Sequence, residues 1–150
     1  MKKSTWGWLA AAGLCALTSL PAAAQFQRPE DAIKYRQSAF TVMAAHFSRI
    51  GAMAQGRVPF DAAAAAANAE IVATMSRLPF GGFVDGSQGG KAKAEAWSDR
   101  AGFNAAASKM QEEAGKLAAA ARSGNADQIR AAFGATAGSC KACHDNYRAQ

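Results

Sequence analysis

Apolar residues recur at spacings of three and four along most of the chain after residue 28, which predicts helices rather than strands. The first helix is expected from Pro29 to Gln55. Proline suits the first helical position, and the carboxylates of Glu30 and Asp31 favour a helix N-terminus. One side of this helix carries an apolar stripe together with one arginine: Ile33, Arg36, Phe40, Met43, Phe47 and Ile50.

The second helix is expected to begin after Pro59, with Asp61 as its N-cap, and to end before Pro79. It starts with an alanine run, residues 62–67, which combines high helix propensity with room for close helix packing. Its larger apolar residues are expected to be buried: Ile71, Val72, Met75 and Leu78.

A glycine-rich connection follows, from about Pro79 to Ala92. It follows no strand and lacks the Gly-Lys-Ser/Thr ending of a phosphate-binding loop, so it is interpreted as a crossover between helices. Its aromatic residues, Phe80 and Phe83, are expected either to cap one end of the core or to border a cofactor.

Two further helices complete the pattern. The third should begin at Trp97 or Asp99 and run to Ala121, with Gly124 beyond its end. The fourth should begin after the N-cap Asn125. Its apolar side also carries candidate chemistry, in the order Ile129, Phe133, Cys140, His144 and Tyr147. Two short links and one long link predict an all-α fold, an antiparallel up-down-up-down four-helix bundle with its cofactor between facing helices.

The strongest chemical signal is Cys140-Lys141-Ala142-Cys143-His144. Two cysteines two residues apart with a following histidine are the c-type haem attachment signature, in which the thiols bond the haem vinyl groups and His144 ligates the iron. On a helix all three side chains share one face. A zinc site that recruits His46 would lack the usual spaced ligand pairs, and a thioredoxin-like dithiol would need a βαβ context.

The N-terminus predicts export. Lys2 and Lys3 precede an apolar stretch and the small-residue site Ala22-Ala23-Ala24, so residues 1–24 are interpreted as a cleaved signal peptide and residues 25–150 as the mature domain. This implies the periplasm in a bacterial setting. No later stretch is long enough for a membrane span. The 17 basic and 11 acidic residues are scattered, which gives no support to nucleic-acid binding and leaves a basic surface for an acidic redox partner.

The mature chain resembles cytochrome c′, the class II c-type cytochromes. The matching pieces are residues 29–31, 34–37, 97–99, 131–134, 139–145 and 147–148. The position of the haem signature at the C-terminus, after three helices, indicates class II. The resemblance implies one covalent haem c, and a homodimer through the first two helices, which the alanine run 62–67 would allow to approach closely.

The resemblance also assigns roles near the iron. Phe40, four residues after Arg36, takes the place of an apolar residue, commonly leucine, that closes the side opposite His144. Arg148 corresponds to an arginine beside that histidine. Arg36 is expected either to pair with a haem propionate or to be a solvated helix charge. Met43 and His46 lie further around the helix from Phe40, and they are the alternative iron ligands.

A five-coordinate iron with an apolar open side predicts binding of small neutral gases, nitric oxide first and carbon monoxide weakly. The alternative is a periplasmic electron-transfer cytochrome, for which six-coordinate iron is better suited. An enzyme is not expected, because Phe40 offers no acid or base to the open side.

Overall fold

The computed structural model describes residues 25–150, and the expected signal peptide lies outside the described residues. Within residues 25–150 the fold consists of four long helices, with no β-strand. These are α1 (Pro29–Ala54), α2 (Ala62–Met75), α4 (Arg100–Arg122) and α5 (Ala126–Tyr147). The crossover between α2 and α4 contains a 3-10 helix, η1 (Pro79–Gly82), and the one-turn helix α3 (Glu95–Ser98).

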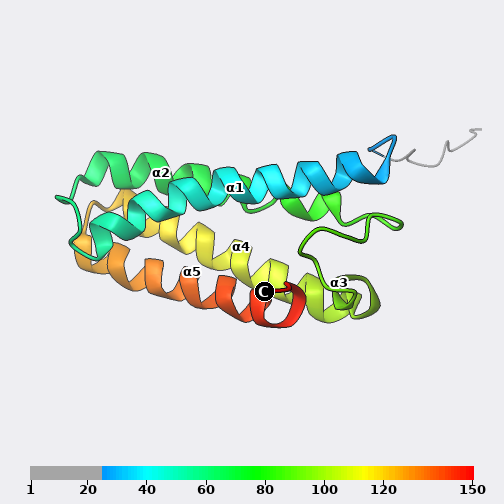
Figure 1. Ribbon diagram of the computed structural model, residues 1–150. Coiled ribbons are helices and arrows are strands. Elements are labelled where there is room, and N and C mark those ends of the chain that lie inside the picture. Colours follow the sequence, from blue (N-terminus) through cyan, green and yellow to red (C-terminus); the bar gives the residue numbers. More distant parts are fainter. Residues whose placement is uncertain (1–24) are drawn as a thin grey trace, which may run out of the picture.

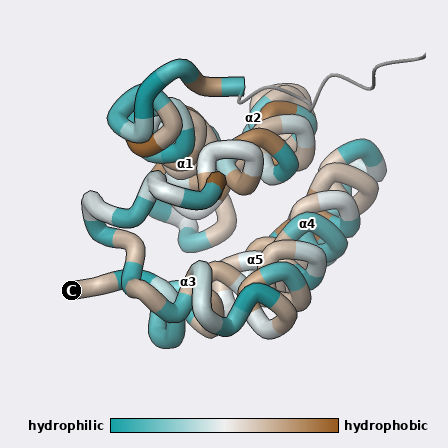
Figure 2. Tube along the Cα trace, turned by 90° about the vertical axis from the view of Figure 1, so that its right-hand side faces the viewer, coloured by the Kyte–Doolittle hydropathy of each residue, from teal (hydrophilic) through white to brown (hydrophobic). Residues whose placement is uncertain are grey.

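The long helices run alternately up and down (Figure 1). Both short links lie at one end of the bundle, and the crossover and the C-terminus lie at the other. Seen from the crossover end, α1 and α2 form one layer, and α4 and α5 form the other (Figure 2). The predicted antiparallel four-helix bundle is therefore confirmed, and no helix among residues 25–150 is long and apolar enough to cross a membrane.

The helix ends follow the local sequence. The side chain of Asp61 accepts a hydrogen bond from the Ala64 N–H at 2.9 Å, and the side chain of Asn125 accepts from the N–H groups of Asp127 and Gln128 at 3.0 Å. Both predicted N-caps are confirmed, and each satisfies N–H groups that have no partner inside the helix. Gly124 ends the turn after α4 with φ +69°, a conformation that favours glycine.

Two sequence predictions are confirmed only in part. Of the two expected starts of the third helix, Asp99 is confirmed, because it caps α4 by accepting the Gly102 N–H at 3.0 Å, whereas Trp97 lies in the separate one-turn helix α3. The predicted burial of Ile71 and Leu78 is wrong, since their exposed fractions are 37% and 41%. Helix α2 packs against α1 and α4, and its apolar residues, Ile71 among them, extend around the helix beyond these two contacts. Leu78 lies beyond the end of α2, directly before η1.

The bundle core is built from buried residues of all four long helices, among them Met43, Ile50, Val72, Leu117 and Ile129. A second cluster lies at the crossover, and we call it the aromatic cluster. Its buried members are Phe83, Ala96, Phe103 and Tyr147, with Phe40, Phe80, Trp97 and Cys143 packed against them. The predicted capping of the core by Phe80 and Phe83 is thus observed.

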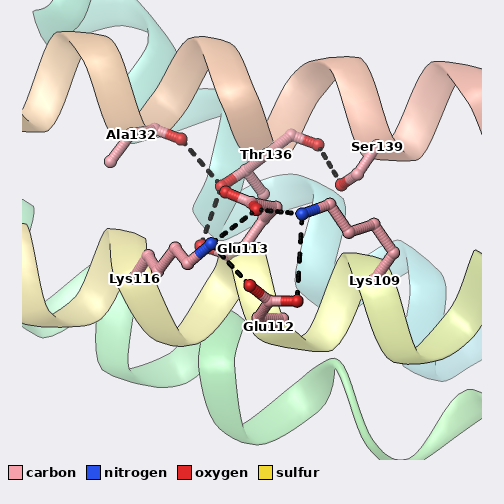
Figure 3. A network of polar contacts seen from close by, with 7 residues as sticks. All are labelled: Lys109, Glu112, Glu113, Lys116, Ala132, Thr136 and Ser139. Atoms are coloured by element: carbon pink, nitrogen blue, oxygen red, sulfur yellow. Dashed lines mark hydrogen bonds and ion pairs between the residues drawn. The ribbon is translucent and has the colours of Figure 1, made fainter.

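A polar network joins α4 to α5 just before the cysteine motif (Figure 3). The buried carboxylate of Glu113 accepts hydrogen bonds from Lys109 at 2.8 Å and Lys116 at 3.0 Å, and both lysines lower its pKa. Across the helix interface, the buried Thr136 hydroxyl lies 3.2 Å from the Glu113 carbonyl oxygen and 2.9 Å from that of Ala132. These contacts fix the position of α5 relative to α4 one turn before Cys140.

Candidate haem-binding site

Helix α5 carries both cysteines and the histidine within two turns. Cys140 and Cys143 are free, half-buried thiols, and burial raises the pKa of each. Cys140 packs against the bundle core, whereas Cys143 packs against the aromatic cluster. The two thiols therefore lie at the boundary between the two apolar clusters, one helical turn apart.

His144 is exposed on the last turn of α5. Partial desolvation of the imidazole, and then the positive charge of Arg148, lower its pKa below the ordinary value. Both effects favour the neutral imidazole, which is the form that binds metal ions. Arg148 is the C-cap of α5, and its N–H donates to the His144 carbonyl oxygen at 3.0 Å.

The crossover holds this last turn in place. The Lys93 N–H donates to the Tyr147 carbonyl oxygen at 2.9 Å, and the Lys93 ammonium donates to the Asp145 carbonyl oxygen at 2.9 Å. The phenol of the buried Tyr147 donates to Asp99 at 2.6 Å. The two Lys93 bonds satisfy carbonyl groups that have no partner inside the helix, and the Tyr147 bond fixes the end of α5 against the start of α4.

Phe40 lies on α1, where the bundle core meets the aromatic cluster, and it packs against both. Its half-buried ring meets Phe80 of η1 edge to face, with ring centroids 6.0 Å apart. Phe80 in turn contacts Phe103 at 5.7 Å, and Phe103 contacts Tyr147 at 5.3 Å. The structure therefore brings Phe40, Phe83, Cys143 and Tyr147 to one apolar region, although they come from three parts of the sequence.

Arg36 is buried, with an exposed fraction of 3%, so its interpretation as a solvated helix charge is wrong. Its guanidinium donates to the carbonyl oxygens of Gly82 at 2.7 Å and Gly89 at 3.0 Å, and to the Ser87 hydroxyl at 3.1 Å. It also lies over the Phe83 ring, 4.6 Å from the centroid, where a cation is attracted to the ring face. Burial lowers its pKa. The arginine thus organises the glycine-rich crossover around α1.

The two alternative iron ligands lie elsewhere on α1. Met43 is a buried member of the bundle core, with an exposed fraction of 8%. The Nδ1 atom of His46 lies 2.8 Å from the side-chain oxygen of Asn68 on α2, so His46 is at the α1–α2 interface. Because the Asn68 amide nitrogen donates to the Ala64 carbonyl oxygen, the Asn68 amide oxygen faces His46 and accepts a hydrogen bond from its Nδ1–H.

A family model described as Cytochrome C′ matches residues 31–148, which include Arg36, Phe40 and the whole cysteine motif. The chain belongs to the cytochrome c′ family. Cytochrome c′ of Rubrivivax gelatinosus is 54% identical over 127 residues, covering 83% of this chain and 98% of the relative. Cytochrome c′ of Alcaligenes xylosoxydans xylosoxydans is 51% identical over 124 residues, covering 83% of this chain and 98% of that relative.

Solved cytochrome c′ structures share the fold. The crystal structure of the Rubrivivax gelatinosus protein has a TM-score of 0.80 at 53% identity and covers 83% of this chain and 99% of its own. A nitric oxide complex of a single-residue variant from Alcaligenes xylosoxidans has a TM-score of 0.81 at 49% identity, covering 84% of this chain and 99% of its own. Members of this family are haem proteins, and a nitric oxide complex is known for at least one of them.

Membership of the cytochrome c′ family implies a covalently bound haem c with iron, and the donor set of this chain fits that group. The two thiols are unpaired with each other, share one helix face with His144 and adjoin apolar rings that can pack on a macrocycle. Zinc has no comparable support, because no three potential ligands among residues 25–150 cluster as a metal site. The thiols would therefore hold haem by thioether bonds, and His144 would ligate its iron.

Sequence reasoning missed two contacts that position this site. Asp99 is predicted as a helix start, but its bond to Tyr147 joins residues 48 positions apart and has no local signature. Lys93 caps the last turn of α5 through both its N–H and its ammonium group, and no sequence signal indicates this contact. The dipeptide Ser98-Asp99 before an apolar run indicates the cap of α4 alone.

Proposed function

We propose that this cytochrome c′ binds one haem c and captures small diatomic gases, nitric oxide first and carbon monoxide weakly. Cys140 and Cys143 attach the haem, His144 ligates the iron, and Phe40 closes the opposite side. The haem iron supplies the coordination position at which a gas binds. The nitric oxide complex of a relative at 49% identity supports this assignment.

The main support for the proposal is that Phe40 has an apolar phenyl ring and that this ring packs in apolar surroundings. A phenyl ring has no lone pair with which to ligate iron, so the iron is expected to stay five-coordinate, bound by His144 alone. The ring packs between the bundle core and Phe80, in apolar surroundings that favour neutral ligands over charged ones. Bound dioxygen, which acquires negative charge, would gain no hydrogen bond from this ring.

The same geometry favours binding over catalysis and over electron transfer. Peroxide chemistry needs an acid or base beside the iron, and Phe40 supplies neither. An electron carrier is better served by a second strong ligand, and the thioether of Met43 is buried in the bundle core instead. Phe83, Tyr147 and Arg148 are assigned to the haem surroundings, and Arg36, which organises the crossover, is assigned to the propionate side.

We assign the mature protein, residues 25–150, to the periplasm and infer that it acts as a homodimer through α1 and α2. Exposed apolar side chains support this dimer: Val42 on α1 is 43% exposed, and Ile71 on α2 is 37% exposed. An open groove of about 520 Å³ between the helices is lined by Tyr35, Val42, Met75 and Leu78, among others. In the alanine run, Ala65 is fully buried inside the protomer and Ala64 and Ala66 pack against the bundle core, whereas Ala63 and Ala67 are exposed.

Optical spectra of the purified ferric and ferrous holoprotein test the function. We expect high-spin, five-coordinate spectra in both states and a large change when nitric oxide is added to the ferrous protein. Carbon monoxide should change the ferrous spectrum only at much higher concentrations than nitric oxide. A low-spin six-coordinate ferrous spectrum that neither gas alters would instead establish the electron-transfer cytochrome, with an unidentified periplasmic redox partner.

A further inference from the structure

The crossover helix η1 lies directly against the side of α1 that carries Phe40. Ala32, Arg36 and Phe40 are spaced by four residues and share this side. A Cβ atom at Gly82 would lie 2.7 Å from the Ala32 carbonyl oxygen and 2.9 Å from the Arg36 Cβ, so glycine is needed for this close approach. Two turns of α1 thus define where η1 sits, and the next turn carries Phe40.

Two hydrogen bonds and the burial of Pro79 fix η1 in this position. The Arg36 guanidinium donates to the Gly82 carbonyl oxygen at 2.7 Å, inside the protein. Pro79, which begins η1, is buried, and the Phe83 N–H donates to the Phe80 carbonyl oxygen at 3.2 Å. The backbone that carries Phe80 is therefore held by residues on α1 and within the crossover itself.

The Phe80 ring is held by three aromatic neighbours. It stacks near Phe83, with centroids 6.2 Å apart and planes inclined by 24°, and it meets the buried Phe103 at 5.7 Å. On its remaining side it meets Phe40 edge to face at 6.0 Å and 88°. Both rings are half-buried, but Phe80 has three aromatic neighbours, whereas Phe40 has Phe80 as its single aromatic neighbour among the described residues.

Side chains move between staggered rotamers, and each rotamer needs free volume. A gas that enters the space under Phe40 must displace that ring, and a fixed ring beside it removes one direction in which it can move. We infer that Phe80 is a positioning residue that holds Phe40 in its closed position and thereby limits how fast a diatomic ligand enters. This inference rests on the proposed function, because it assumes that Phe40 closes the ligand side.

The test is the association rate of carbon monoxide with the ferrous holoprotein in four forms: the parent protein, Phe80→Ala, Phe40→Ala and the double variant. We expect Phe80→Ala to raise the rate about two- to tenfold, on the scale of one lost aromatic pair. Because Phe80 acts through Phe40, the same substitution should change the rate by less than about twofold when Phe40 is already alanine.

The matched control is Phe133→Ala. Phe133 is also half-buried and belongs to an aromatic pair, stacked on Phe47 with centroids 4.4 Å apart, but the pair lies outside the aromatic cluster. Loss of this pair should lower stability without raising the association rate. Phe80→Leu, which keeps apolar bulk, replaces Phe80→Ala if the alanine variant does not fold. A crystal structure of the Phe80 variant gives a second readout, in which Phe40 should occupy an additional rotamer.

The outcomes separate the two claims. If Phe40→Ala raises the association rate and Phe80→Ala does not, the positioning role of Phe80 is refuted, whereas the closing of the ligand side by Phe40 is supported. Equal acceleration by Phe80→Ala with and without the Phe40 ring would also refute the positioning role, because Phe80 would then act without Phe40. If neither substitution alters the rate, Phe40 does not close the ligand side, and the proposed function fails with the inference.

Discussion

The hydroxyl of Tyr147 donates a 2.6 Å hydrogen bond to Oδ2 of Asp99, while Oδ1 of the same carboxylate accepts the Gly102 N–H at 3.0 Å. One carboxylate therefore caps α4 and anchors the last turn of the helix that carries His144. The bond to Tyr147 is the main cause of a lowered pKa at Asp99, and it raises the pKa of Tyr147 to about 12.

This pair predicts a pH-dependent effect of Tyr147→Phe. The folded-state pKa of Asp99 lies below its ordinary 3.8, so the stability it contributes is present above that pH and is lost as the pH falls through the folded value. Tyr147→Phe should thus be destabilising near pH 7 and nearly neutral once the pH lies well below the folded-state pKa of Asp99. Urea unfolding across this range measures the difference, and an equal loss at both pH values would contradict it.

At alkaline pH the stability contributed by the Tyr147–Asp99 pair changes in the opposite direction, because it is lost as the pH rises. Because the pKa of Tyr147 is raised from 10.0 to about 12, its contribution is complete below pH 10 and is lost as the pH rises toward 12. The free energy of unfolding of the parent protein should therefore fall toward that of Tyr147→Phe in this interval. Ultraviolet titration of the tyrosinate band provides the independent check.

Arg36→Lys should destabilise the protein by about 2 kcal/mol, because lysine cannot reproduce the fork that reaches Gly82 and Gly89 together. The buried site would also retain a charge with fewer hydrogen bonds. Arg49→Lys, at an exposed position of the same helix, is the matched control and should change the free energy of unfolding by less than about 0.5 kcal/mol. Equal effects of the two substitutions would contradict the role of Arg36 in the crossover.

Haem attachment is tested by mass. Acid–acetone extraction should leave the haem on the polypeptide, and the intact mass should equal that of residues 25–150 plus one haem. Cys140→Ala or Cys143→Ala leaves one thiol for a thioether, whereas the double substitution should release all haem on extraction. Free haem from the parent protein would refute covalent attachment, and a mass that includes residues 1–24 would refute cleavage of the signal peptide.

Phe40→Ala should raise the affinity of the ferrous protein for carbon monoxide by about tenfold, since the ring no longer has to be displaced. It should also cost about 1–3 kcal/mol of stability through the cavity that it leaves. Phe40→Met offers a thioether at the same position and should shift the spectrum toward six-coordinate low spin. If Phe40→Ala leaves the affinity unchanged while Met43→Leu alters the resting spectrum, Met43 is a ligand and the electron-carrier function is favoured.

The homodimer is tested at Ile71, whose side chain lines a second shallow groove on α2 beside Met75. Ile71→Asp would place a charge in an apolar interface, so the protein should become a monomer in light scattering at tens of micromolar. Arg49→Lys, the exposed control used above, should remain a dimer. A parent protein that is itself monomeric would refute the dimer, and a dimeric Ile71→Asp would place its interface elsewhere.

Features that depend on neighbours along the chain could be predicted from the order of residues alone. The caps at Asp61 and Asn125, the period of the helices and the spacing of Cys140, Cys143 and His144 all operate within one or two turns, so the order of residues is enough to predict them. These local signals led to the four-helix bundle, and the family match confirmed it.

Features that depend on contacts between residues far apart in the sequence became visible only in the tertiary structure. Arg36 could be assigned to solvent or to a propionate until its contacts with Gly82 and Gly89, 46 and 53 residues away, showed it buried. Likewise, the periodicity of α2 could not predict that Ile71 is exposed, because periodicity shows where apolar residues lie and not which helices cover them. The contact of Phe40 with Phe80 could not be predicted for the same reason. The spacing of apolar residues shows which side of a helix is apolar, and only the packed bundle shows which residues that side contacts.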